Sequence, residues 1–379
     1  MVKVETSEPG LYGLGCGTFT QRIQAVKTAV DEYLKPIMIG RNVENIEDAW
    51  QTMYGSSYWR NGPVLNNAIS GIDEALWDIK GKMANMPVYQ LLGGKCREAA
   101  LTFDDAGGTS FEEIGDNVQT SLDKGFRHVR IFGRMPGDPE ELERQKPENA
   151  PKGFYIDPKR YIYDTVALFK YLRERFGDWP EFMIDVHEKL TPAETITLAK
   201  ALEPYHLFFL EDSLPPEQME WFKRLRQQVS TPLAMGELFN NVNEFKSVIV
   251  NQEIDFIRCH ISQLGGLSPA RRLAAFCDYF GVKTCWHQPG DISPVGIAAH
   301  LHLDLSIPNF GIQEFRAYND ATLELFPGTP ELRGIYLYAN DKPGFGVDFN
   351  EELAKKFPAG GYQGGFFMSR LPDGTAIRS

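Results

Sequence analysis

The sequence has no excess of basic residues and no long hydrophobic run. It contains 39 Lys and Arg against 51 Asp and Glu among 379 residues, so its net charge is −12. This charge balance disfavours nucleic acid as a general partner, because neutralising phosphates requires a basic face. The longest apolar runs, such as LFFL at residues 207–210, are far too short to cross a bilayer, and the opening MVKVETSEPG has no apolar signal segment. We therefore predict no membrane association.

Paired cysteine motifs are also missing. The five cysteines are widely spaced and form no CxxC pair: Cys16, Cys96, Cys259, Cys277 and Cys285. This usage is typical of reduced thiols in a cytoplasmic protein. The 25 Phe, 15 Tyr and 6 Trp supply ample apolar surface, so the chain can bury a large core without disulfides.

From residue 99 onward, short apolar runs alternate with helical stretches. Eight runs end in polar residues: AALTFDD (99–105), HVRIFG (128–133), EFMIDVH (181–187), LFFLED (207–212), PLAMGE (232–237), FIRCHIS (256–262), VKTCWH (282–287) and FGIQEF (310–315). Eight strands alternating with helices indicate an α/β fold, a closed (β/α) barrel over residues 96–316. A doubly wound sheet is the competing fold, but no glycine-rich phosphate-binding turn follows an early strand.

The two chain ends do not share this alternation. Residues 2–6 alternate like a strand, and helical periodicity follows at residues 21–34, 47–54 and 68–83. Residues 317–379 carry turn signals such as DKPG and a tail rich in glycine and aromatics. We predict that residues 1–95 form a capping domain and that residues 317–379 pack against it. The strand at 2–6 needs a partner, either in an N-terminal segment missing from this sequence or elsewhere in the chain.

Three carboxylates follow three consecutive predicted strands, each one strand–helix unit after the last. They are Asp185 in IDVH, Glu211 in LED and Glu237 in GEL. Active sites of such barrels lie at the carboxyl ends of the strands, so the three side chains converge on one rim. Carboxylates without a counter-charge repel one another, and a hard cation such as Mg²⁺ relieves that cost. The pattern therefore predicts a magnesium site; the alternative is three ordinary acidic residues where strands meet solvent.

Further polar residues lie at or near strand ends on the same predicted rim: Arg130, Arg258, His287, Asp291 and Glu314. His187 lies two residues after Asp185, so on a strand both side chains would point to the same side. Arginine is a natural partner for a substrate carboxylate. For Arg258, the alternative is a salt bridge with Asp255 or with a rim carboxylate.

Several segments together carry a family resemblance: YWRNGPVLNNAISGIDEALWDIKGK, MPVYQLLGG, IDVHEKLTP, LEDSLPPE, MGELFN, WHQPGDISPVG, FGIQEF and DKPGFGVDF. They span essentially the whole chain, which resembles the enolase superfamily and most closely its mannonate dehydratase subgroup, also called the galactonate dehydratase family. The resemblance implies a (β/α)7β-type TIM-like barrel with an α+β capping domain formed from both chain ends. It also implies a homo-oligomer and Mg²⁺ held by Asp185, Glu211 and Glu237.

The resemblance further implies a lyase, a Mg²⁺-dependent dehydratase of an acid sugar such as mannonate, gluconate or galactonate. Removal of the α-proton gives an enediolate, and loss of the β-hydroxyl then gives a 2-keto-3-deoxy acid. His187 matches the family's general acid, and Arg130 matches an arginine that assists the base. Four residues match positions that contact substrate: Arg258, His287, Asp291 and Glu314.

Three departures from the family pattern affect base and substrate positions. One is near the N-terminus, where Thr20 stands in place of the family's asparagine. The family's base is a tyrosine, but no tyrosine follows Arg130 at the expected spacing. Tyr155 lies further along, in the long segment 134–158 that we expect over the barrel mouth, and could substitute only if that loop folds inward. Asp105 stands where the family has a substrate-contacting histidine. Two alternatives therefore remain open: epimerisation or racemisation through the same enediolate, and a non-catalytic protein that binds a metabolite.

Overall fold

The computed structural model describes residues 1–132, 146–290, 292–357 and 369–377, and the chain divides into two compact units. The first unit comprises Met1–Thr102, Gly236–Lys246 and Ile257–Gln363. The second comprises Phe103–Met235, Ser247–Phe256 and Gly364–Ser379. The boundaries that we expected from the sequence, at residues 95 and 316, remain a prediction.

Five parallel strands form the centre of the second unit. In sheet order they are β3 (Ala100–Ala106), β4 (His128–Ile131), β6 (Glu181–Asp185), β7 (Phe209–Glu211) and β8 (Leu233–Met235). β3 begins in the first unit and pairs with β4 only from Asp104 onward. The register places Asp105 opposite Arg130, Asp185 opposite Glu211, and Glu211 opposite Ala234. The carboxyl ends of these strands therefore gather the polar side chains.

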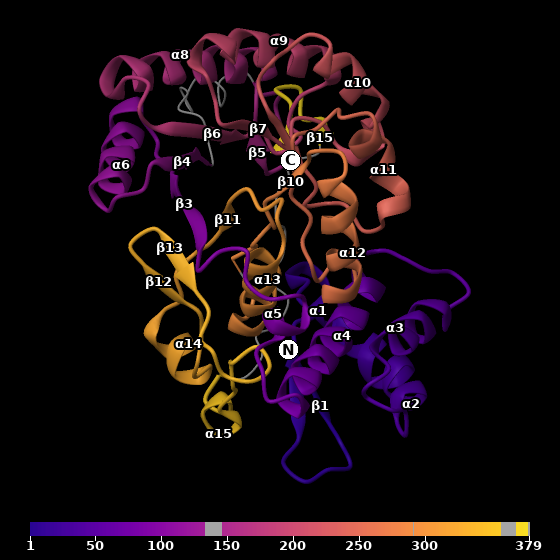
Figure 1. Cartoon of the computed structure of the whole chain (residues 1–379). Helices are drawn as coiled ribbons and strands as arrows, with labels where there is room; N and C mark the ends of the chain where they lie inside the picture. The colour runs from indigo at the N-terminus through magenta and orange to yellow at the C-terminus, as the bar shows by residue number, and fades with distance from the viewer. Residues whose placement is uncertain (133–145, 291, 358–368, 378–379) are drawn as a thin grey trace. The chain divides into compact units, whose positions relative to one another are not determined.

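Helices follow the strands of the second unit in alternation. They are α6 (Phe111–Asp123), α8 (Pro158–Phe176), α9 (Pro192–Leu202) with the 3-10 turn η3 (Glu203–Tyr205), and α10 (Glu220–Arg226) after η4 (Pro216–Gln218). In Figure 1, α6, α8, α9 and α10 form one row, and neighbours in that row pack on each other. Local sequence sets where they begin: Thr191 and Glu194 form a capping box before α9, and the Asp157 side chain caps α8.

The remaining predicted strands and their helices continue the alternation. They are α11 (Val242–Val250), β9 (Phe256–Ile257), α12 (Leu267–Asp278), β10 (Lys283–Thr284), α13 (Pro294–Ser306) and β11 (Gln313–Glu314). Each of the eight apolar runs predicted as strands therefore contains a strand, and a helix follows each of the first seven within the described residues. This confirms the predicted α/β alternation.

In the first unit, an N-terminal hairpin packs on a long helix. Strand β1 (Val2–Glu5) pairs antiparallel with β2 (Tyr12–Gly15), so the partner that β1 needed lies ten residues along the same chain. The hairpin contacts α4 (Pro63–Met83), and a Cβ at Gly15 would overlap the carbonyl oxygen of Gly71. Glycine at position 15 permits this close approach, because it carries no Cβ.

The first unit contains further elements beside α4 and α13. Their bounds are η1 (Thr20–Arg22), α1 (Ile23–Thr28), the π-helical turn η2 (Ala29–Leu34), α2 (Lys35–Met38), α3 (Ile46–Gly55), α5 (Val88–Leu91), α14 (Asp320–Leu325), β12 (Glu331–Arg333), β13 (Tyr336–Tyr338) and α15 (Glu351–Ala354). Buried Asp78 of α4 accepts hydrogen bonds from the backbone N–H of Leu14 (3.0 Å) and of Phe345 (2.8 Å). Segments from both chain ends thus meet on this helix.

A small sheet in the second unit joins the end of the chain to residues before α8. Strand β14 (Ser369–Arg370) pairs in parallel with β5 (Phe154–Tyr155) and antiparallel with β15 (Ala376–Ile377). Much of the predicted loop 134–158 lies outside the described residues, but this pairing fixes its last part. No helix in the described part of the chain is both long and apolar enough to span a membrane.

Candidate active site

Two predicted metal ligands lie side by side at the carboxyl ends of β6 and β7. Asp185 and Glu211 are the last residues of their strands, stand opposite each other in register, and are 4% and 0% exposed. One oxygen of each, together with one of Asp212, lies within 4.8 Å of the others. Buried carboxylates this close repel one another unless a cation neutralises them. Oxygen donors of this kind are those that Mg²⁺ prefers, so the donor set fits the predicted metal.

Asp212 is the member of this group that the sequence reasoning missed. Only Glu211 was predicted as a ligand at this strand end. In the structure, Asp212 follows the end of β7 with a left-handed backbone (φ 38°), which breaks the alternation. Its 2% exposure and its proximity to Asp185 make it a further possible oxygen donor. The only signal in the sequence was its position beside Glu211.

His187 lies in a tight turn just beyond β6, not on the strand as we had assumed. His187 and Glu188 both have left-handed backbones (φ 54° and 59°), and the His187 N–H donates a 2.8 Å hydrogen bond to Asp185 Oδ1. A ring nitrogen of His187 lies within 4.8 Å of a carboxylate oxygen of Asp185. The predicted neighbourhood of these two residues is therefore present, although the turn, rather than strand alternation, produces it.

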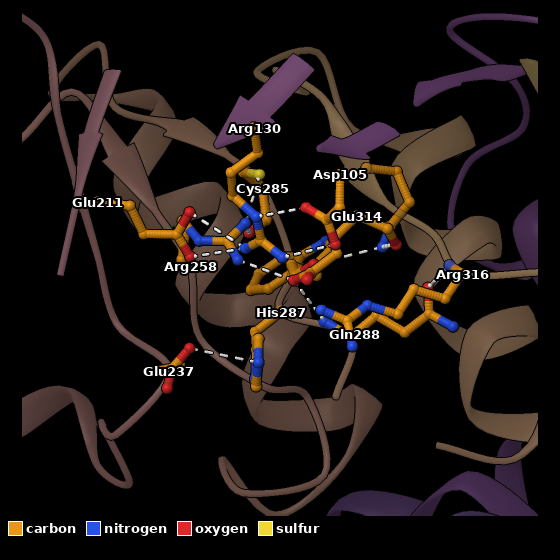
Figure 2. Close-up of polar contacts among 12 residues, drawn as sticks. Asp105, Arg130, Glu211, Glu237, Arg258, Cys285, His287, Gln288, Glu314 and Arg316 are labelled. Carbon is orange, nitrogen blue, oxygen red and sulfur yellow. Dashed lines mark hydrogen bonds and ion pairs between the residues drawn. The ribbon is translucent and has the colours of Figure 1, made fainter. Parts of the chain in front are cut away.

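Arg130 of β4 is held between two carboxylates, as Figure 2 shows. Its Nη1 donates to Glu211 Oε1 (3.0 Å) and Oε2 (3.2 Å). Its Nε donates to Asp105 Oδ1 (2.8 Å), and its Nη2 donates to Asp105 Oδ2 (3.2 Å). The guanidinium carbon also lies 5.0 Å from the centre of the Phe103 ring and 5.3 Å from that of Phe132, within the range of cation–π contacts. Arg130 is 2% exposed, so its position is closely fixed.

The third predicted ligand, Glu237, belongs to the first unit, where it contacts His287. His287 Nε2 lies 3.3 Å from Glu237 Oε2 (Figure 2). The preceding residue, Gly236, has φ 144°, and a Cβ there would lie 2.9 Å from the backbone N of Cys259. Only glycine allows this close approach, so the local backbone positions the Glu237 side chain.

Two more predicted residues form a buried ion pair in the first unit. Arg258 Nη2 donates to Glu314 Oε2 at 2.8 Å, and the two side chains are 0% and 2% exposed. The backbone N–H of Gln288 donates to the same Glu314 oxygen at 3.0 Å (Figure 2). Of the alternatives for Arg258, the rim carboxylate is thus the partner found here, whereas Asp255 pairs with Arg226 at 2.7 Å.

A second histidine next to His287 was not predicted. The ring of His260 lies 5.9 Å from that of His287 and 5.8 Å from that of His300, in edge-to-face contacts. Burial lowers the pKa of His260 to about 4, although the charge of Glu314 opposes the shift. Burial also lowers the pKa of His300 well below its usual range. Both rings are therefore neutral near pH 7, and nothing in the sequence distinguished His260 from a core residue.

Of two further candidates, Tyr155 and Asp291, the structure describes only Tyr155. The hydroxyl of Tyr155 donates to the carbonyl oxygen of Pro151 at 2.7 Å, within its own loop, and the ring packs under the amine of Lys146 at 4.1 Å. The Tyr155 side chain therefore stabilises its own loop. Asp291, predicted to contact substrate, lies outside the described residues.

Comparisons with known proteins match both parts of the chain to one superfamily. Residues 1–93 match the N-terminal domain family of mandelate racemase and muconate lactonizing enzyme, and residues 113–353 match the enolase C-terminal domain-like family. The chain is 52% identical to a D-galactonate dehydratase family member of Musicola paradisiaca (strain Ech703), over 100% of this chain and 94% of that protein. It is 53% identical to a D-galactonate dehydratase family member of Enterocloster bolteae, with the same coverage.

A solved structure agrees over the whole chain. It is an enolase from Pantoea ananatis with bound D-gluconate and Mg, which matches with a TM-score of 0.95 and 51% identity, covering 100% of this chain and 95% of that one. This match, with the two family matches, confirms the predicted fold class: a TIM-like barrel with a capping domain.

Proposed function

The chain belongs to the D-galactonate dehydratase family of the enolase superfamily, and we propose that it is a Mg²⁺-dependent acid-sugar dehydratase. As a lyase, it would convert a sugar acid into its 2-keto-3-deoxy acid. The substrate would resemble the D-gluconate bound by the Pantoea ananatis protein. The observation that carries this proposal is the pair of buried carboxylates, Asp185 and Glu211, with His187 beside them.

The proposed metal ligands are Asp185, Glu211 and Glu237. Ala234, opposite Glu211 in register, precedes Glu237 by three residues. Because each residue spans at most about 3.6 Å, the Cα of Glu237 lies within about 11 Å of that of Ala234. Mg²⁺ at these oxygens would supply positive charge where the substrate carboxylate becomes more negative as its α-proton leaves.

The chain's own residues would position the substrate and move protons. His187 would give a proton to the departing β-hydroxyl. The hydrogen bond from its backbone N–H to Asp185 holds it at the end of β6, beside the proposed metal ligands. Arg130, held by Asp105 and Glu211, would stabilise negative charge at the same strand ends. Four residues would contact the sugar acid: Arg258, His287, Asp291 and Glu314.

A second candidate function follows from the environment of Tyr155. Its hydroxyl is engaged with Pro151, so the side chain is not presented as a base. This observation favours a protein that binds a sugar acid without removing its α-proton. The two functions differ in a measurable product, so one experiment separates them.

The test is to incubate the protein with D-mannonate, D-gluconate and D-galactonate, with Mg²⁺ or with a chelator, in D₂O. Dehydration predicts a 2-keto-3-deoxy product that requires Mg²⁺. Deuterium at the α-carbon without loss of water would instead indicate epimerisation, and binding without either change would indicate the non-catalytic function. Absence of product with every sugar acid would overturn the dehydratase proposal.

A matched pair of histidine variants assigns the acid. His187 and His206 both have left-handed backbones (φ 54° and 46°), and His206 is exposed on the surface. Asparagine tolerates that conformation, so His187→Asn and His206→Asn impose similar backbone demands. We expect His187→Asn to lower kcat about 10²-fold or more and His206→Asn to leave it unchanged.

We also propose a homo-oligomer in the cytoplasm, with no nucleic-acid or membrane partner. The cysteines support the location, because all five are thiols and four of them are buried. Light scattering coupled to size exclusion tests the assembly, and a monomeric mass would contradict it.

A further inference from the structure

Asp105 and Asp104 are adjacent acidic residues on β3 with different surroundings. The Asp104 carboxylate accepts from Ser121 Oγ (2.9 Å) and lies 3.6 Å from Lys124 Nζ, on the side of helix α6. The Asp105 carboxylate instead forms two parallel hydrogen bonds to one edge of the Arg130 guanidinium. Strand alternation explains the difference, since neighbouring side chains point to opposite faces.

Two different parts of the Arg130 guanidinium therefore donate to two different carboxylates. Asp105 takes Nε and Nη2, and Glu211 takes Nη1 with both of its oxygens (Figure 2). Two-pronged arginine–carboxylate pairs are strong and fix orientation, because both hydrogen bonds are charge-assisted. Arg130 and Glu211 are 2% and 0% exposed, so neither charge is well screened by solvent.

This arrangement has a consequence for a cation that binds Glu211. The oxygens that would bind the cation are the same two that accept from Arg130 Nη1. A cation and the guanidinium therefore compete for Glu211, and the outcome depends on what else holds the arginine. Without the Asp105 charge, Arg130 would be drawn more strongly to Glu211.

We propose that Asp105 is a positioning residue that sets the affinity of the site for Mg²⁺. It balances part of the Arg130 charge and anchors the guanidinium on the edge away from Glu211, so Glu211 can turn its oxygens to the metal while Arg130 stays in place. This inference rests on the proposed Mg²⁺ site at Asp185 and Glu211. It assigns a function to one of the residues at which the chain departs from the family pattern.

The test measures the Mg²⁺ dissociation constant by calorimetry, without substrate, for the full chain and its variants. Asp105→Asn keeps the size of the side chain but removes its charge. We expect the Mg²⁺ dissociation constant to rise about tenfold, which is the lower end of the loss in affinity typical when a residue that supports a metal ligand is replaced. Asp104→Asn removes the same charge from the neighbouring residue and should change it by about twofold at most, because its partners face α6.

A double variant shows whether Asp105 acts through Arg130. In an Arg130→Met background, Asp105→Asn should weaken Mg²⁺ binding by no more than about threefold, since only its distant charge remains. Asp105→Glu, which restores a carboxylate, should recover part of the affinity and so exclude a folding defect. An equal effect of Asp105→Asn in both backgrounds, or an effect no larger than that of Asp104→Asn, would overturn the inference. Failure of the wild-type protein to bind Mg²⁺ would instead refute the proposed function.

Discussion

The buried pair of Arg258 and Glu314 gives a quantitative prediction about stability. Glu314→Gln keeps the shape of the side chain but removes the charge that balances Arg258, which is 0% exposed and stays charged. Breaking a buried pair by removing one partner costs roughly 3–5 kcal/mol. The amide oxygen can still accept one hydrogen bond, from Arg258 or from Gln288, so we expect the free energy of unfolding to fall by about 2–4 kcal/mol.

Chemical unfolding followed by tryptophan fluorescence measures this loss, and two further variants define its cause. The double variant Arg258→Met, Glu314→Gln should lose less stability than the sum of the two single losses, by at least about 1 kcal/mol, because it leaves no unbalanced buried charge. Glu331→Gln breaks the exposed pair with Arg333 in the same unit and should have no measurable effect. Additive single changes, or a Glu314→Gln protein as stable as the wild type, would refute the reasoning.

Three other variants test separate features. Burial raises the pKa of Asp73 to about 7, above its unfolded value, so the folded protein favours the protonated carboxyl. The free energy of unfolding should therefore fall as pH rises through about 4 to 7, and Asp73→Asn should remove that fall. A stability difference between variant and wild type that stays constant across this pH range in unfolding measurements would contradict the prediction. Gly236→Ala places a Cβ 2.9 Å from the backbone of Cys259, whereas Gly334, also at positive φ, has open space around it. Gly236→Ala should therefore lower the midpoint of thermal unfolding more than Gly334→Ala does. Equal losses would argue against the close approach. Tyr155→Phe removes one loop hydrogen bond, so we expect about 1 kcal/mol of lost stability at most and product formation within about twofold of wild type; a loss of about 10²-fold would identify Tyr155 as the base.

The sequence predicted the strand ends better than the side-chain pairings. Asp185 and Glu211 could be placed together because parallel strands align their carboxyl ends, and the register confirms this. The partners of Arg130 were not predicted, and the structure gives it two, Asp105 and Glu211. Which partner a buried charge takes depends on register and side-chain reach, and neither can be read from spacing alone.

Backbone conformation limited the prediction at the turns after the strands. Alternation is a reliable guide only while the chain is extended, and it ends at Asp185 and at Glu211. Left-handed residues then reorient Asp212 and His187, and neither position is a glycine that would have signalled such a turn. This is why Asp212 was missed and why His187 was placed correctly for an incomplete reason.

The most direct test of the magnesium site is anomalous diffraction from crystals grown with Mn²⁺, which accepts the same oxygen ligands as Mg²⁺. We expect one strong peak at about 2.1 Å from an oxygen of each of Asp185, Glu211 and Glu237. A peak bound by Asp212 in place of Glu237, or no peak near Asp185 and Glu211, would contradict the proposed site.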